Sequence, residues 1–431
     1  MTTQLTADPR RRTLLVFIFV MAFQQGVTIN LLPVLFEAFA ETFRLDFQQR
    51  GQIQSFFSVG VMVALFASGF VTERIAARRS ALLALGLSGL GAILVAMAPD
   101  FLLLRLGAAV MGMGTLWALS VTSATIAAHF APQSQRLFMW TMAVFAATGT
   151  AAPYGLGHLA SFLGVWRPIL FGVGLYLWAS GVAVALLFWG SLGNTGLRVR
   201  LPGSPPGPRP AGDSAGKATP WETCAGWLTG LFRRYSGSLL GQAALLLIGF
   251  LVVLDNLAAG NIVAWTPNLC QIRFGGDTAL AGEIMGANAF GYLVGRIILG
   301  LFLTGRYSDR VLLGLCYAGG MLAYSLLLWV PDPRMAMAMM VLQGVFLSAQ
   351  APTVYSLASI RFPDRAGTAV PLVDAIGSIG AIAGPSLMGW AAQQMGGLER
   401  ALWLIPLTGC LLIAISLGWE ARERSKKEQQ W

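Results

Sequence analysis

Apolar residues run through this chain of 431 residues in long blocks, which short polar or charged segments separate. A helix needs about 20 mostly apolar residues to cross a bilayer, whereas a helix on the surface of a soluble protein keeps one polar face. The pattern therefore predicts an all-α integral membrane protein with twelve transmembrane helices in two six-helix bundles. The predicted spans are residues 13–39, 51–73, 79–98, 101–129, 136–163, 165–190, 238–265, 278–305, 309–330, 333–362, 365–394 and 399–420.

One long segment, residues 191–236, interrupts this pattern. Its stretch LPGSPPGPRPAGDSAGKATP is rich in Pro and Gly and predicts a flexible cytoplasmic linker. The following WETCAGWLTGLFRR has apolar residues at helical spacing, which predicts a short helix on the membrane surface. We therefore divide the chain into a first six-helix bundle, residues 1–190, and a second one, residues 237–431.

The two bundles resemble each other at a fixed offset of 232 positions. The matched pairs are Gly112 with Gly344, Phe130 with Phe362, Pro153 with Pro385, Gly157 with Gly389 and Gly164 with Gly396. Two repeats of the same orientation are typical of transporters in which one bundle rocks against the other around a site at the membrane midplane. The duplication therefore predicts alternating access.

Composition and charge agree with this prediction. Hydrophobic residues make up 56% of the chain and charged residues 11%, with a mean hydropathy of +0.67, whereas soluble proteins carry roughly a quarter charged residues. The net charge of +10 is unevenly distributed, because 21 of the 29 Lys and Arg residues lie in segments on the side of the N-terminus. This bias predicts a plasma (inner) membrane protein with both termini in the cytoplasm. It explains the charge without a nucleic-acid partner and leaves contact with membrane lipids as a second interpretation.

Motifs for catalysis or cofactors do not appear in the sequence. It has no phosphate-binding loop, no dinucleotide fingerprint and no paired histidine ligands, and its four cysteines lack metal-ligand spacing. We therefore predict no enzyme activity, no cofactor and no metal site, and we expect a monomer.

The loop after the second span, GFVTERIAARR, resembles the loop signature of the major facilitator superfamily, Gly-x-x-x-Asp-Arg-x-Gly-Arg-Arg. Glu73 stands in place of the Asp, and Ala76 stands in place of the second Gly. The resemblance implies the major facilitator fold over the whole chain. It also implies a cytoplasmic gate of Glu73, Arg74 and Arg78, which would hold the two bundles together in the outward-facing state.

A narrower resemblance, to the fucose–proton symporter family, rests on GVFLSAQAPTVYSLASIRFPDRAG (344–367) and YLVGRIILG (292–300). It implies a sugar or related polyol as the solute, with proton coupling. That family carries membrane carboxylates in helices one and four, whereas here helix one offers Gln24, Gln25 and Asn30, and helix four has no carboxylate. Whether a proton is transported with the solute therefore stays open.

Ionisable side chains inside the predicted spans are candidates for coupling, because each costs at least about 2.5–3.5 kcal/mol to insert and usually faces a cavity or a partner. We place Asp255 in the outer half of the seventh span, as a site for a proton or a solute hydroxyl; a salt bridge or a cap near Gly260 is the alternative. Asp374 and Arg296 lie at equal depth in two other spans, so we expect a structural or gating ion pair, with direct substrate binding as the alternative. A pair that breaks when Asp374 is protonated would be a coupling device.

Amides and aromatic rings complete the predicted substrate site, since an amide offers both donors and an acceptor to a hydroxylated solute. Asn288 and Tyr292 share one helical face and could bond either a sugar or each other. Trp117 could stack on a sugar ring, although tryptophans in membrane proteins are more often packing or interface residues. The predicted substrate-binding residues are Gln24, Asn30, Trp117, Asn256, Asn288, Tyr292, Gln343 and Gln350.

The sequence thus predicts a secondary transporter, a sugar symporter by the narrower resemblance, that imports a small neutral hydroxylated solute. Two rivals stay open. One is an exporter of amphipathic drugs or metabolites, for which the 16 methionines and 25 phenylalanines leave room. The other is a solute sensor that binds without transporting.

Overall fold

The computed structural model of the chain describes residues 9–130, 134–187, 243–302, 308–362 and 366–428. The predicted linker and surface helix, residues 191–236, lie outside the described residues. The described part is almost entirely helical, as the sequence predicts.

Helices of the first half of the chain follow the predicted spans closely. They are α1 (Pro9–Ile29), α2 (Leu31–Val34), α3 (Phe36–Phe43), α4 (Phe47–Arg74), α5 (Ala77–Ala96), α6 (Phe101–His129), α7 (Ser134–Leu163) and α8 (Arg167–Leu187). Those of the second half are α10 (Ala243–Phe274), α11 (Thr278–Phe302), α12 (Asp309–Leu327), α13 (Pro333–Leu347), α14 (Gln350–Arg361), α15 (Ala366–Gln394), α16 (Leu398–Ala401) and α17 (Leu404–Glu428).

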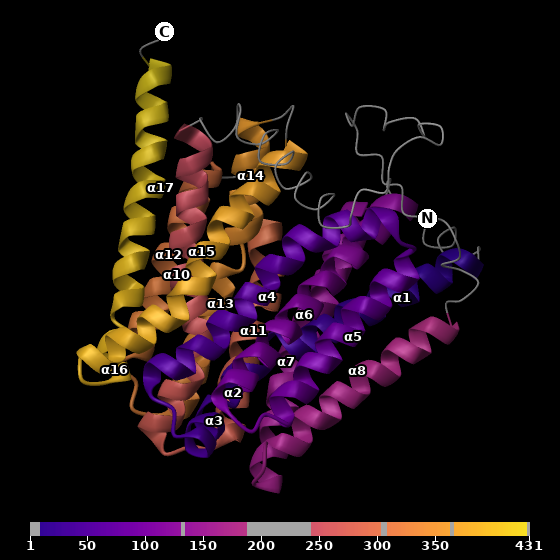
Figure 1. The fold of residues 1–431 in the computed structure, drawn as a ribbon. Coiled ribbons are helices and arrows are strands. Elements are labelled where there is room, and N and C mark those ends of the chain that lie inside the picture. Colours follow the sequence, from indigo (N-terminus) through magenta and orange to yellow (C-terminus); the bar gives the residue numbers. More distant parts are fainter. Residues whose placement is uncertain (1–8, 131–133, 188–242, 303–307, 363–365, 429–431) are drawn as a thin grey trace, which may run out of the picture.

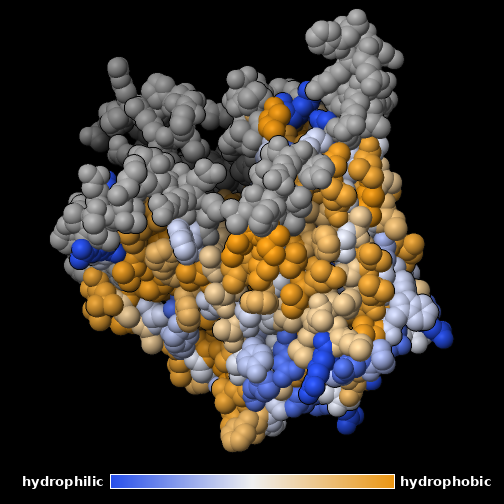
Figure 2. All heavy atoms as spheres, turned by 180° about the vertical axis from the view of Figure 1, so that it is seen from behind, coloured by the Kyte–Doolittle hydropathy of each residue, from blue (hydrophilic) through white to orange (hydrophobic). Residues whose placement is uncertain are grey.

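Ten stretches of the described residues are long and apolar enough to cross a membrane. Helices α7 and α11 are not among them, so membrane crossing by these two stays a prediction. Figure 2 shows hydrophobic side chains over the middle of one face of the molecule, where lipid would contact it. The all-α membrane fold predicted from the sequence is confirmed.

Two predicted spans are broken helices. The first is interrupted at Asn30 and Leu35, and the tenth at Ser348 and Ala349. Pro352 is the third residue of α14, where its missing N–H removes no intrahelical hydrogen bond. The sequence pattern missed these breaks because the long apolar blocks on both sides of each one suggest a single continuous helix.

Helix α10 is longer at its far end than the sequence predicts. It continues to Phe274, nine residues past the predicted end, because Pro267 is accommodated within the helix. Asp255 therefore lies about 18 Å from the first residue of α10 and about 28 Å from the last. The prediction that Asp255 lies in the outer half of its helix is wrong.

Both chain termini lie at one end of the molecule, which we call the terminal end; the opposite end is the distal end (Figure 1). The helices of the two halves diverge toward the terminal end and converge toward the distal end (Figure 1). Most of the contact between the halves is made by two helix pairs, α4 with α15 and α7 with α11.

Glycines let these two helix pairs approach closely near the distal end. A Cβ on Gly51 would lie 2.1 Å from the carbonyl oxygen of Pro385, and a Cβ on Gly282 would lie 2.3 Å from that of Pro153. Small residues allow such backbone approach where lipid gives no hydrophobic drive to pack. Pro153 and Pro385 are one of the pairs matched in the sequence, so the duplication relates the two crossings.

Candidate functional site

Five helices of the second half bring together two carboxylates and three tyrosines. Asp255 of α10 is 7% exposed and accepts a hydrogen bond of 2.9 Å from the Tyr317 hydroxyl of α12. Asp374 of α15 accepts one of 3.1 Å from Tyr355 of α14. Asn256, which follows Asp255, bonds the carbonyl of Gly377, three positions after Asp374, so the two carboxylates lie on neighbouring turns of α10 and α15. Tyr292 of α11 lies near Asp255. We call these five residues the carboxylate–tyrosine cluster.

Helix packing explains how these residues meet. Helix α10 packs along α15, and α14 contacts α10, α12 and α15. Within the described part of the chain, neither Asp255 nor Asp374 has a cationic partner. A buried carboxylate without a counter-ion is costly, and one neutral hydroxyl offsets only part of that cost. The cluster is therefore suited to bind a proton, a cation or the hydroxyl groups of a solute.

The predicted ion pair between Asp374 and Arg296 does not form. Asp374 bonds Tyr355 instead, and Nη1 of Arg296 is buried without a hydrogen-bond partner in the described residues. Helix α11 packs against α7 and α13, whereas α15 packs against α4 and α10. Equal depth along two helices thus did not place the two side chains on facing surfaces, and the prediction is wrong.

The amides of α11 and α13 bond each other. The side-chain NH2 of Asn288 donates to the side-chain oxygen of Gln343 and, at 3.4 Å, to the carbonyl of Met340. Asn288 therefore pairs with Gln343 and not with Tyr292. Nε2 of Gln343 and Oε1 of Gln350 are buried and have no partner among the described residues. Buried amides normally use this capacity, so these atoms could bond a hydroxylated solute.

Three other predicted amides form no hydrogen bond with the cluster within the described residues. Asn256 donates to the carbonyl of Gly377 on α15 at 2.9 Å, which fastens α10 to α15. Asn30 precedes α2 at the break of the first span, and its side chain makes no capping hydrogen bond there. Gln24 donates to the Tyr176 hydroxyl of α8 at 3.0 Å.

Trp117 is packed between two helices of the first half. Its side chain belongs to α6, is 6% exposed, and donates its indole N–H to Ser80 Oγ of α5 at 2.9 Å. The ring therefore contributes to packing in this conformation.

The predicted gate residues are only partly described. Glu73 and Arg74 end α4, but their side chains lie outside the described residues. Arg78 is half-buried at the start of α5. The gate stays a prediction.

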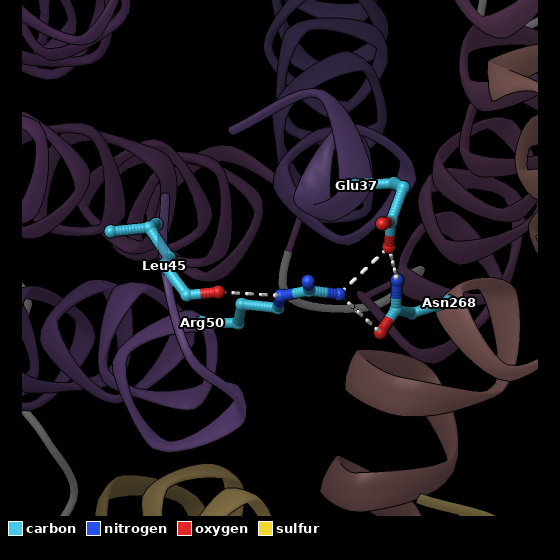
Figure 3. Close-up of polar contacts among 4 residues, drawn as sticks. All are labelled: Glu37, Leu45, Arg50 and Asn268. Atoms are coloured by element: carbon cyan, nitrogen blue, oxygen red, sulfur yellow. Dashed lines mark hydrogen bonds and ion pairs between the residues drawn. The ribbon is translucent and has the colours of Figure 1, made fainter. Parts of the chain in front are cut away.

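Sequence reasoning missed a polar network at the distal end (Figure 3). Arg50 of α4 forms an ion pair of 2.7 Å with Glu37 of α3, and Asn268 of α10 donates to the same carboxylate oxygen at 2.7 Å. Arg50 also donates to the Leu45 carbonyl at 3.4 Å. The network joins the two halves. No spacing signal could reveal the contact between the halves, because Asn268 is more than 200 positions away from both Glu37 and Arg50.

Tyr317 was also missed. Its span also carries the hydroxyls of Tyr324 and Ser325, and nothing in the sequence shows which of them meets a carboxylate. A tyrosine is usually hydrogen-bonded when buried, which is the one signal that could have suggested a partner.

Comparison with known structures identifies transporters of the same fold. A bacterial homologue of the human lysosomal transporter Spinster, in an inward-facing conformation, has 16% identity and a TM-score of 0.69, over 95% of this chain and 97% of that one. The nucleoside transporter NupG has 11% identity and a TM-score of 0.72, over 94% and 99%. A D-xylose–proton symporter has 14% identity and a TM-score of 0.67, over 94% and 97%. No curated protein matches the chain.

The sequence model described as Major Facilitator Superfamily matches residues 14–332 and again residues 246–431. These matches cover nearly the whole chain, and the two helix bundles, their crossings and the shared fold agree with them. The chain belongs to the Major Facilitator Superfamily.

Proposed function

We propose that the protein is a secondary transporter that moves a small hydroxylated solute, such as a monosaccharide or polyol, by alternating access. The carboxylate–tyrosine cluster is the observation that carries this proposal, because it places acceptors and donors for hydroxyl groups inside a membrane bundle. Two transporters of the same fold are named for a nucleoside and for D-xylose, both of which bear hydroxyl groups. The resemblance of residues 344–367 to fucose–proton symporters also favours a sugar.

The proposal includes proton coupling through Asp255 or Asp374. When both carboxylates are ionised, two interacting negative charges lie in a place without a counter-ion. One proton removes one of these charges, and its movement down the membrane potential supplies about 2.3 kcal/mol per 100 mV. Solute hydroxyls that bond the same carboxylates would link solute binding to this proton.

The arrangement of the two halves supports alternating access. The helix crossings and the Glu37–Arg50–Asn268 network close the distal end, while the helices diverge toward the terminal end (Figure 1). With both termini in the cytoplasm, as the positive-inside bias predicts, this conformation would be open to the cytoplasm.

Binding and transport can be tested separately. A thermal-shift screen of the purified protein against sugars, polyols and organic acids should reveal a ligand, since binding to the folded state raises its melting temperature. Uptake of that ligand into proteoliposomes with an inward-directed proton gradient then tests transport. Binding without uptake would indicate a sensor and overturn the transporter proposal.

Asp255→Asn tests the coupling. This variant should exchange solute across the membrane but should not concentrate it, because the amide cannot carry the proton. Glu41→Gln, a substitution at an exposed carboxylate of α3, serves as the control and should transport normally. If Asp255→Asn still concentrates solute as the control does, Asp255 is not the coupling group.

A further inference from the structure

A groove with a volume of about 730 Å³ lies between α7 of the first half and α11 and α13 of the second. Glu283 and Arg334 line it close to the distal ends of α11 and α13, and Phe290 and Met337 are among its apolar lining residues. Phe290 is 48% exposed and lies on the opposite face of α11 from Asn288. The groove is therefore separate from the carboxylate–tyrosine cluster and faces the surroundings of the bundle.

The duplication gives this groove a counterpart beside α4 and α15, and there the space is filled. Gln52 follows Gly51 as Glu283 follows Gly282, and Arg105 precedes Gly112 by the seven positions that separate Met337 from Gly344. Gly51 and Gly282 make corresponding contacts, with the carbonyls of Pro385 and Pro153, so the offset is 231 between α4 and α11 and 232 between α6 and α13. Gln52 is therefore the counterpart of Glu283, and Arg105 the counterpart of Met337.

Arg105 occupies the counterpart space with its own side chain. Its guanidinium donates to Gln52 Oε1 at 2.9 Å, and it lies 4.4 Å and 5.1 Å from the ring centroids of Phe101 and Phe56. In the groove a methionine replaces the arginine and a carboxylate replaces the amide. At these two positions the groove therefore has a charged acceptor, Glu283, but no arginine side chain that fills the space as Arg105 does.

The charged groups of the groove are incompletely paired. Glu283 Oε1 lies 3.1 Å from His158 Nε2, and both side chains are partly exposed. The Arg334 side chain makes no hydrogen bond or ion pair within the described ranges; only its backbone N–H is bonded, to Asp332. A carboxylate and an unpaired guanidinium at the charged end of an apolar groove complement an ammonium and a phosphate carried on an acyl chain.

We propose that the groove binds one aminophospholipid, such as phosphatidylethanolamine, from the leaflet at the distal end. Arg334 holds the phosphate, Glu283 holds the ammonium, and an acyl chain lies along Ala287, Phe290 and Met337. Because both halves of the chain form the groove where the distal end is closed, the bound lipid stabilises that conformation. This binding is independent of which solute is transported.

Native mass spectrometry of the full chain tests the proposal, with phosphatidylethanolamine, phosphatidylcholine and phosphatidylglycerol as probes. One molecule of phosphatidylethanolamine should be retained about tenfold better than either of the others. Glu283→Gln should remove this preference, and Arg334→Gln should weaken retention of all three lipids, while Arg334→Lys restores it. Met337→Arg copies the filled counterpart and should exclude the lipid.

Arg400→Gln is the matched control, because Arg400 is an exposed arginine of α16 and is not among the groove residues. It should retain lipid as the unmodified chain does. Equal retention of the three lipids would overturn the proposal. So would unchanged retention in both Glu283→Gln and Met337→Arg, whose folding is verified by the same melting temperature as the control.

Discussion

The two helix pairs that join the halves, α4 with α15 and α7 with α11, share a backbone arrangement but differ in their side chains. Ser55 and Ser386 form a neutral hydrogen bond of 2.7 Å across the first pair. Across the second, His158 contacts Glu283, and Ser161, near the end of α7, donates to Asp277, which directly precedes α11. Duplication thus preserved the close approach of the backbones, while titratable groups are found on the α7–α11 side.

Preventing the close approach of the backbones should have the largest effect on transport, and the effect should be equal at α4–α15 and at α7–α11. Gly51→Ala and Gly282→Ala each add a methyl group where only about 2 Å separates its position from a backbone oxygen. Each should therefore hold the distal end open and lower transport at least tenfold. Gly86→Ala is the control, since nothing lies within 4 Å of its added carbon. Distances between spin labels placed across the distal end would measure the opening; closure as in the control would contradict the prediction.

Removing the contact of Asn268 should give an intermediate effect near the α4–α15 side. Asn268→Ala leaves the ion pair of Glu37 and Arg50 within the first half and removes its hydrogen bonds to the second. The closed distal end should lose about 1–3 kcal/mol, because a hydrogen bond to a charged group is lost. Asn261→Ala is the control on the same helix, because the Asn261 amide donates to Leu257 of its own helix. The same label distances give the populations of the open and closed distal end in each variant. Equal populations in Asn268→Ala and Asn261→Ala would contradict this prediction.

Lowering the pH should give the smallest of these effects on closure of the distal end, and Asp277 beside α11 should carry it. The hydrogen bond from Ser161, with smaller contributions from the backbone N–H groups of Leu280 and Ala279, holds the pKa of Asp277 below its usual value. A lowered pKa in the closed state stabilises that state above the unperturbed pKa of about 3.9, and the contribution is lost as pH falls through the lowered pKa. Below about pH 4 the α7–α11 side should therefore loosen.

The variant Asp277→Asn provides the comparison, because the network beside α4 also holds a carboxylate, Glu37, and Glu283 lies opposite α7. Label distances across α7 and α11, followed from pH 7 to pH 3, should change more in the unmodified chain than in Asp277→Asn. The difference should stay below about 1 kcal/mol, since Asp277 is largely exposed. An equal change in both proteins would show that acid acts through other groups.

Much of the fold was predictable, because membrane crossing demands long apolar segments that composition reveals directly. The matched pairs of the duplication also anticipated the crossings, where Gly157 and Gly389 again lie against backbone carbonyls of the other half. The end of α10 was not predictable from local signals, because Pro267 usually suggests that a helix ends nearby. Its accommodation depends on the surrounding helices.

The candidate site was predictable only in part. Asp255 and Asp374 stand out in the sequence because charges are rare in spans, but their partners Tyr317 and Tyr355 come from other helices. Which face of a helix meets which neighbour is a tertiary property, and a helical period does not specify it. For the same reason, the expected partner of Asp374 was a cation, Arg296, and its actual partner is a neutral hydroxyl.

The break in the tenth span is a point at which the second half can bend. Helix α13 carries Gln343, α14 carries Gln350 and Tyr355, and only Ser348 and Ala349 connect the two helices. Helix α14 can bend at this break while α13 stays packed against α11. Bending α14 at this break would narrow the terminal end of the molecule without moving the rest of the second half. The same bend would move the Tyr355 hydroxyl away from Asp374.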